Sequence, residues 1–278
     1  MRNLIAAEWL KVRKRKLPWI LAVSLVAIIV LLYGTLLLAA STATADQSFA
    51  RELNNNLRVV NTVRFGDGIV YRVVALLSLI LTATIVANEY HWRTVMTRVT
   101  WTGERVRPFL ATMMVVGALS AAGLVLGHAV VALAAIGGEA ARGTFEGSDL
   151  GLWLVTDSGL AALRSVPGVA VFVAGAATAA LLTRSTAVGV CVPLAVLFLE
   201  PLGAAILTVS DGTEWLSRLL LSQNVDALLA ANGAVRGSTE DLPEGLPSAW
   251  QGALSLVLYA AVALAVGVRV LARREMPE

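Results

Sequence analysis

The feature that most constrains this chain is a set of six long apolar blocks separated by polar stretches. The blocks cover residues 18–40, 69–87, 108–136, 160–183, 187–209 and 249–271. An α-helix rises about 1.5 Å per residue, so each block is long enough to cross a hydrocarbon core roughly 30 Å thick. A helix satisfies its backbone hydrogen bonds within itself, and the blocks lack the alternation of barrel strands. The sequence therefore predicts an all-α, polytopic membrane protein with six transmembrane helices, in one domain over residues 1–278.

The distribution of basic residues predicts the orientation of these helices. The N-terminal tail, the 88–107 loop, the turn at Arg184 and the C-terminal tail share one side and carry most of the lysines and arginines. Acidic residues outnumber basic ones in the loops on the other side. Because Lys and Arg accumulate on the cytoplasmic side, both termini and the 88–107 loop are expected in the cytoplasm, as in a multi-pass protein of the cell (cytoplasmic or inner) membrane. The net charge of +3 is then a topology signal, and no nucleic-acid partner is expected.

The first block has an alternative interpretation as a cleavable signal. The basic start, the apolar run and the small residues of "LAASTATADQ" resemble a secretory signal with a cleavage site near Ala45. The block is longer than the roughly 7–15 apolar residues of such a signal, which favours a retained span. N-terminal sequencing that begins at Asp46 would establish cleavage.

Several kinds of chemistry have no residues to support them. Cys191 is the single cysteine, so an intramolecular disulfide is excluded, and His91 and His128 are too few for a His/Cys metal cluster. No Gly-Lys-Ser/Thr sequence of a phosphate-binding loop occurs. We therefore expect no catalytic residue, no metal and no cofactor on this chain. An intramembrane enzyme would have to depend on His91, His128 or Cys191.

Ionisable residues inside spans are costly and are functional candidates by default. Glu200 and Arg164 are the clearest, and Asn88 is a further polar residue near the end of the second span. Glu200 and Arg164 both fall toward the outer half of the bilayer, which predicts an ion pair between them. The pair is open to two interpretations, a structural contact or a contact with transported cargo. Pro201 removes a backbone donor and predicts a kink after Glu200.

Other residues in the spans have structural interpretations. Tyr71 and Arg72 begin the second span and are expected to be interfacial anchors. His128 is expected to lie at the membrane interface, or to have its ring nitrogens hydrogen-bonded, rather than to act as a proton relay. Gly123 and Gly127 form a small-xxx-small face for close helix packing.

The outer region between the fifth and sixth blocks contains "EWLSRLLLSQNVDALLAAN". Its apolar residues recur at helical spacing, which predicts short amphipathic helices on, or dipping into, the outer surface. Whether they re-enter the membrane is left open by the sequence.

The strip "NEYHWRTVMTRVTWTGERVRP" (88–108) separates the second and third blocks. If residues 89–101 are helical, Glu89 and Arg93 are i,i+4 partners, and Trp92, Val95 and Val99 form a second face. A loop that only obeyed the positive-inside rule would account for the arginines, but less well for this length and two-faced pattern.

Three features together resemble the ABC-2 type permeases, the membrane subunits of ATP-driven ABC exporters. "LIAAEWLKVRKRKLPWI" is similar to the amphipathic entry helix of that family, and "EYHWRTVMTRVTWTGERVRPFLA" is similar to its pattern after span two. Six spans, with a longer outer region between spans five and six, extend the resemblance over nearly the whole chain. Arg93 stands where the family usually has Gly, and Thr112 where a Lys is frequent.

The resemblance implies that the strip is a coupling helix that docks into a separate ATPase subunit. The implied contact residues are Glu89, Trp92, Arg93, Thr94, Arg98, Glu104 and Arg105. The entry helix would lie near the same partner through Glu8, Trp9, Lys11 and Arg13. The resemblance also implies two ATPase copies that bind ATP and Mg, and a second six-span permease subunit, identical or not.

The leading functional hypothesis is therefore export of a hydrophobic or amphipathic cargo, such as a drug, natural product, peptide or lipid-like molecule. The alternative is a membrane scaffold or accessory subunit that binds a cytoplasmic partner without transporting. An ATPase that co-purifies and responds to cargo would distinguish the two.

Overall fold

The computed structural model describes residues 1–42, 57–91, 106–143, 152–209, 214–231 and 246–273, which are helical apart from short turns and caps. The helices are α1 (Arg2–Arg13), α2 (Lys16–Thr42), α4 (Val59–His91), α6 (Val106–Arg142), α7 (Leu152–Thr183), α8 (Thr186–Val209), α9 (Glu214–Ser217), α10 (Leu221–Ala230) and α11 (Ala249–Arg273).

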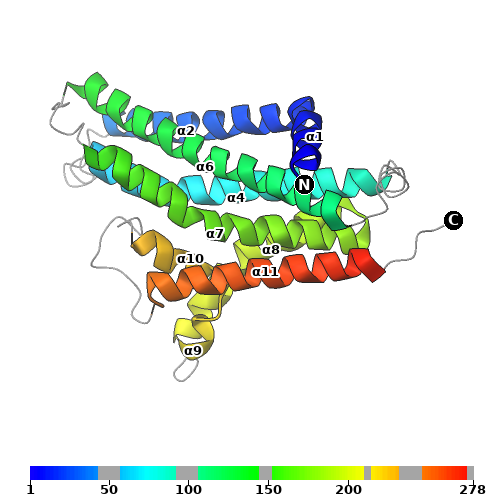
Figure 1. The fold of residues 1–278 in the computed structure, drawn as a ribbon. Helices are drawn as coiled ribbons and strands as arrows, with labels where there is room; N and C mark the ends of the chain where they lie inside the picture. Colours follow the sequence, from blue (N-terminus) through cyan, green and yellow to red (C-terminus); the bar gives the residue numbers. More distant parts are fainter. Residues whose placement is uncertain (43–56, 92–105, 144–151, 210–213, 232–245, 274–278) are drawn as a thin grey trace.

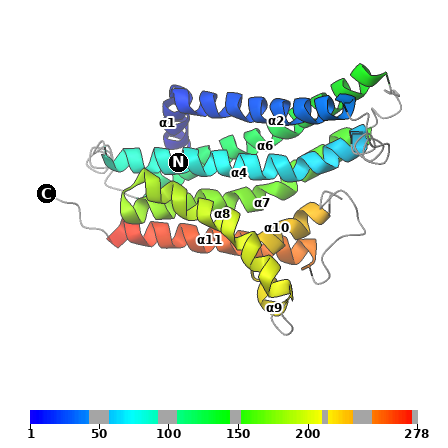
Figure 2. The same ribbon diagram turned by 180° about the vertical axis from the view of Figure 1, so that it is seen from behind.

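Six of these helices are long and apolar enough to cross a membrane: α2, α4, α6, α7, α8 and α11. They run alternately in opposite directions, so α1 and the last turn of α11 lie at the same end of the bundle (Figures 1 and 2). We call this the basic end, because Arg13, Arg107, Arg184 and Arg273 lie on helix ends or turns there. The opposite end is called the far end. The predicted all-α fold with six spans is confirmed.

Three spans are longer at the far end than hydropathy predicted: α7, which begins at Leu152 instead of residue 160, and the neighbouring pair α4 and α6. The second span was expected to begin at residue 69, but α4 begins at Val59, and α6 continues past 136 to Arg142. The extra turns pack together: Glu139 Oε1 accepts the Val59 amide at 2.8 Å, and Arg142 Nη2 donates to the Leu57 carbonyl at 2.6 Å. Charged groups that lowered the local hydropathy thus form hydrogen bonds between the two segments.

α7 lies at the centre of the bundle and packs against α4, α6, α8, α10 and α11. α2 lies at one edge, against α6 and α4, and α11 lies at the opposite edge (Figures 1 and 2). α1 crosses the end of α2 at a steep angle and rests on α6. The core between these helices is built largely from Val, Leu and Ala.

Close approach of α4 and α6 depends on the predicted glycine face. A Cβ on Gly127 would lie 2.6 Å from Val70 Cγ1, whereas a Cβ on Gly123 would lie 3.6 Å from Val74 Cγ1. Of the two predicted glycines, only Gly127 is therefore sterically required. The prediction of a small-residue packing face is confirmed, and α4 is the helix that it contacts.

The outward surface of the bundle is apolar. Large apolar side chains are exposed along α2, α8 and α11, among them Val23, Leu31, Phe198, Ile206 and Leu258. In the most apolar stretch of α8 only 11% of the residues are buried, whereas 61% are buried in the corresponding stretch of α4. Such a surface is costly in water, so these helices face lipid or another membrane subunit.

The described part of the region between α8 and α11 forms two short helices, as predicted. Val225, Leu228 and Leu229 of α10 are buried, and α10 packs against α11, α7 and α8. A Cβ on Gly252, in the first turn of α11, would lie 2.7 Å from the Asn224 carbonyl oxygen. The apolar face of α10 thus packs against the spans, beside the start of α11 (Figure 1).

Candidate functional site

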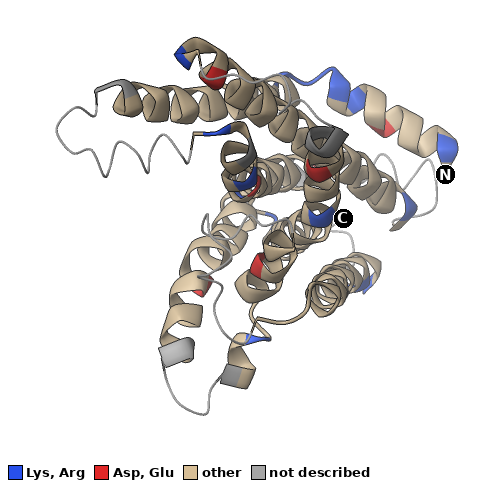
Figure 3. Cartoon of the chain, turned by 90° about the vertical axis from the view of Figure 1, so that its left-hand side faces the viewer, with Lys and Arg blue, Asp and Glu red and all other residues tan. Residues whose placement is uncertain are grey.

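At the basic end, α1 is held against the bundle by a buried carboxylate. Basic residues are conspicuous along α1 in the end-on view of Figure 3, with a single acidic residue among them. That residue is Glu8, which is only 5% exposed, and Val12 one turn later is fully buried. A carboxylate buried to this extent requires charged or hydrogen-bonding partners.

The partners of Glu8 come from α1 and α6. Lys11 Nζ lies 2.7 Å from Glu8 Oε2, and Thr112 Oγ1 lies 3.2 Å from the same oxygen. Lys11 also donates a hydrogen bond to Glu89 Oε1 near the end of α4. Lys11 therefore bridges two carboxylates on different helices. We call Glu8, Lys11, Glu89 and Thr112 the basic-end network.

The basic-end network surrounds the predicted docking strip on both sides. Glu89 lies near the end of α4, and Thr112 lies in the second turn of α6, so the strip connects two helices that α1 clamps together. The predicted contacts Glu8, Lys11 and Glu89 are thus brought together. Asn88 lies beside Glu89 and is half-buried at the end of α4, away from the middle of the span.

The remaining predicted docking residues divide into two groups. Trp9 and Arg13 are exposed on α1, and the Arg13 carbonyl accepts a hydrogen bond from Trp19 Nε1 at 3.1 Å. The others lie outside the described residues: Trp92, Arg93, Thr94, Arg98, Glu104 and Arg105.

Thr112 is a network member whose role the sequence did not reveal. It is fully buried, and its hydroxyl lies within hydrogen-bond distance of both Glu8 Oε2 and the Pro108 carbonyl, at 3.1 Å from the latter. Its partner Glu8 is 104 residues away along the chain. A threonine within an apolar run gives no local indication of such a contact.

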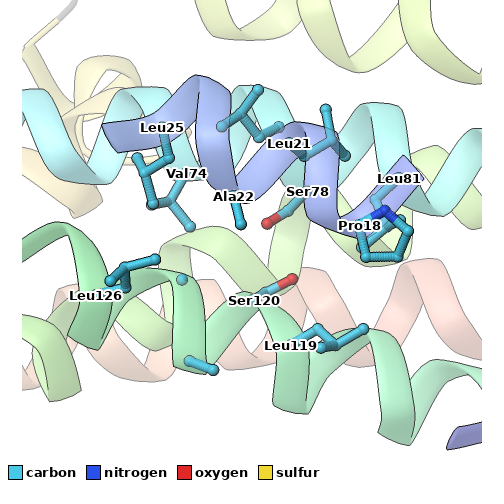
Figure 4. A pocket seen from close by; sticks show the side chains of 13 residues that line it. Pro18, Leu21, Ala22, Leu25, Val74, Ser78, Leu81, Leu119, Ser120 and Leu126 are labelled. Carbon is cyan, nitrogen blue, oxygen red and sulfur yellow. The ribbon is translucent and has the colours of Figure 1, made fainter. Parts of the chain in front are cut away.

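A cavity of about 170 Å³ lies between α2, α4 and α6. Its walls are apolar, with Leu25, Val74 and Leu126 among them, and the hydroxyls of Ser78 and Ser120 point toward it from facing helices (Figure 4). Ser120 Oγ also donates to the Val116 carbonyl at 2.9 Å, so α6 satisfies this hydroxyl.

A second cavity, of about 220 Å³, lies on the other side of Ser120 between α6, α7 and α11. It is lined by apolar residues such as Met113, Val169 and Leu264. Pockets for drug-sized ligands typically measure about 300–1,000 Å³. Each of these cavities is therefore suited to one apolar group, such as part of an acyl chain.

Glu200 and Arg164 do not form the predicted pair. The Glu200 carboxylate accepts the amide of Leu221, the first residue of α10. Arg164 Nη1 donates to the carbonyl of Ala231, just past the other end of α10, at 2.9 Å. Ten residues of helix measure about 15 Å, so the two charges lie at opposite ends of α10.

Both charges of this arrangement suit the helix end that they contact. The first amides and last carbonyls of a helix lack partners within it, and its dipole favours an anion at the start and a cation at the end. Water that would otherwise satisfy these groups is scarce in a membrane. Glu200 and Arg164 are therefore structural caps of α10, contributed by α8 and α7.

Two residues near the far end were misassigned from the sequence. Tyr71 was expected to be an interfacial anchor, but it is buried, and a Cβ on Gly168 of α7 would lie 2.7 Å from its Cε2. Asp67 was counted with the outer loops, but it lies in α4 and is 3% exposed. The early start of α4 explains both errors, because it places these residues inside the span.

The fold and the basic-end network define a six-helix, multi-pass membrane protein whose N-terminal helix is anchored to the second span by an ion pair and to the third by a hydrogen bond. The chain matches no protein-family model and no curated protein. Its resemblance to ABC-2 permeases therefore rests on the residues of the chain itself.

Proposed function

We propose that this chain is the membrane subunit of an ATP-driven exporter of the ABC-2 type, with ATP hydrolysed on a separate subunit. The observation that carries the proposal is the link from Lys11 to Glu89. It joins the entry helix to the end of α4, directly before the segment that would dock the motor. A surface loop with no mechanical role would have no need of this attachment.

The arrangement suggests how motion would travel. A displacement of residues 92–105 acts on the end of α4 and the start of α6, and α1 moves with both because the basic-end network joins them. α4 is one continuous helix of 33 residues and the most buried of the spans, so it would transmit the displacement along the bundle. The small cavities beside Ser120 would change shape as α4 and α6 move relative to α2 and α7.

The proposed assembly contains two such chains and two ATPase subunits that bind ATP and Mg. The exposed apolar faces of α2, α8 and α11 leave ample surface for a second membrane subunit as well as for lipid. In this proposal the chain lies in the cell membrane, and by the positive-inside rule its basic end faces the cytoplasm. Neither cavity alone is large enough for a drug-sized cargo, which supports a pathway shared between two subunits.

Purification from the native host tests the proposal. The tagged chain, extracted in mild detergent, should bring down an ATPase whose activity rises when candidate cargo is added. The double variant Arg98→Glu/Arg105→Glu should lose the ATPase while keeping the spans inserted. The matched double variant Arg58→Glu/Arg218→Glu changes the same charge at exposed far-end sites and should retain it.

Two results would contradict the proposal. If no ATPase co-purifies with the wild type, or if the Arg98/Arg105 variant retains it fully, the docking role is wrong. An ATPase that binds at the basic end but drives no transport would indicate a scaffold instead.

A further inference from the structure

We propose that Asp67 and His128 form an intramembrane proton-binding site, in which one proton is held between the two side chains. The inference goes beyond the proposed function and is independent of it. It concerns the far half of α4 and α6, on the opposite side of the bundle's midpoint from the basic-end network.

The two side chains face each other in the interior of the bundle. Asp67 lies on α4 and His128 on α6, and each is 3% exposed. His128 Nε2 lies 3.4 Å from Asp67 Oδ1. Among the residues that the structure describes, neither of these two atoms has a hydrogen-bond partner.

The opposite ring nitrogen determines the tautomer of the histidine. His128 Nδ1 lies 2.7 Å from the carbonyl oxygen of Leu124, one turn earlier on α6. A carbonyl oxygen only accepts hydrogen bonds, so Nδ1 must carry a proton. In the neutral ring, Nε2 is then bare and presents its lone pair to Asp67.

A proton between the two groups resolves an otherwise unfavourable contact. An ionised carboxylate also presents only lone pairs, so without that proton two acceptors would face each other in a buried site. The proton lies on Asp67 as a carboxylic acid that donates to Nε2, or on Nε2 as an imidazolium that donates to the carboxylate. Both arrangements contain the same proton and have no net charge, which suits burial in a membrane protein.

Neighbouring groups do not supply this proton. Tyr33 of α2 also lies near Asp67, but its hydroxyl donates to the Thr62 carbonyl at 3.1 Å. Arg64 of α4 and Asp157 of α7 act on Asp67 through space with opposite charges. No third His, Cys, Asp or Glu joins the pair as a metal ligand within the described ranges, which favours a proton over a metal ion.

The chain is well suited to a direct test, because it has only two histidines. The full-length His91→Gln variant, labelled with ¹⁵N-histidine and ¹³C-aspartate, would be reconstituted in lipid bilayers and studied by solid-state NMR at pH 7. The ¹⁵N signals report which ring nitrogens of His128 carry protons. The carboxyl ¹³C signal of Asp67, assigned by its loss in Asp67→Asn, reports whether that carboxyl is ionised.

The expected result is one of two combinations: a protonated carboxyl with a neutral ring protonated at Nδ1, or an ionised carboxyl with a doubly protonated ring. An ionised carboxyl beside a neutral ring would overturn the proposal, as would two protonated groups or a bare Nδ1.

Matched variants extend the test to the coupling between the two groups. Where the parent ring is doubly protonated, Asp67→Asn should lower the pH at which His128 loses its second proton; where the parent ring is neutral, it should stay neutral in Asp67→Asn. Asp157→Asn removes an acid that acts on Asp67 through space, and it should have a smaller effect on His128. If the ring is doubly protonated in the parent protein and Asp67→Asn leaves it doubly protonated up to the same pH, the shared site does not exist. The ¹⁵N signals of His128 in the His91→Gln protein are read without any Asp67 variant. A bare Nδ1 would therefore overturn the proposal even if Asp67→Asn folds poorly.

Discussion

Lys11 of α1 makes contacts with two carboxylates at once, Glu8 on its own helix and Glu89 near the end of α4, which is 78 residues away in sequence. The lysine therefore determines how the first helix lies against the second span. Because all three side chains are largely removed from water, the lysine is difficult to replace by a neutral residue.

We expect Lys11→Met to destabilise the protein more than Glu89→Gln. Loss of the lysine leaves two facing carboxylates without their shared cation, whereas loss of the Glu89 charge leaves the Lys11–Glu8 contact intact. Hydrogen bonds to charged groups contribute about 1.5–3 kcal/mol, so a fall in melting temperature of several degrees is expected in detergent. Lys14→Met removes an exposed lysine at the end of α1 and serves as the control. Equal melting temperatures for Lys11→Met and Lys14→Met would contradict the bridging role.

The two ends of α10 should respond to different substitutions. Glu200→Ala should increase amide hydrogen exchange at the start of α10, around Leu221, by removing the acceptor of that amide. Arg164→Ala should instead loosen the end near Ala231. Loss of a helix cap typically costs about 0.5–2 kcal/mol, which corresponds to several-fold faster exchange.

A charge swap distinguishes capping from pairing at these residues. If Glu200 and Arg164 cap opposite ends of α10, Arg164→Glu/Glu200→Arg should be at least as unstable as either single reversal, because each helix end then meets a charge of the wrong sign. Recovery of wild-type stability in the swap would show a direct ion pair after all.

Gly127→Ala should weaken the contact between α4 and α6. The new Cβ would lie 2.6 Å from Val70 Cγ1, and Val70 is fully buried. Overpacking of this kind costs about 1–3 kcal/mol. Gly117→Ala places a methyl group on the same helix where no atom lies within 4 Å, and it should be neutral. The second-site change Val70→Ala should restore stability to Gly127→Ala, and its failure to do so would exclude this clash as the cause.

The orientation of the bundle can be tested by single cysteines in a Cys191→Ser background. With the basic end in the cytoplasm, Arg218→Cys should react with a membrane-impermeant maleimide in intact cells, and Lys14→Cys only after the cells are opened. Both parent residues are exposed. The reverse pattern would place the basic end outside and contradict the positive-inside assignment.

Hydropathy was sufficient to predict the six spans, because each needs about twenty apolar residues whatever its neighbours are. It failed where polar side chains are satisfied by distant partners. Hydropathy assigns Asp67 to a loop because it takes no account of His128, which lies beside it in the fold. The amide of Val59 at the start of α4 is bonded by Glu139, 80 residues away.

The same limitation explains why the predicted ion pair between Glu200 and Arg164 was wrong. Both residues lie in the far half of the bundle, but the intervening partner, α10, is a separate element whose position no local pattern specifies. The docking residues after Glu89 keep the status of a hypothesis, because residues 92–105 lie outside the described part of the chain.

The length of α4 has a consequence for the depth of its polar residues. Its 33 residues measure about 50 Å, roughly 20 Å more than a hydrocarbon core. If the helix is centred on the bilayer, Glu89 lies among the headgroups on one side. Asp67 then lies just inside the opposite boundary of the hydrocarbon core, about two turns from the end of the helix and only a few ångströms from the headgroup region. A proton held there has a short route to one aqueous phase and a long, apolar one to the other.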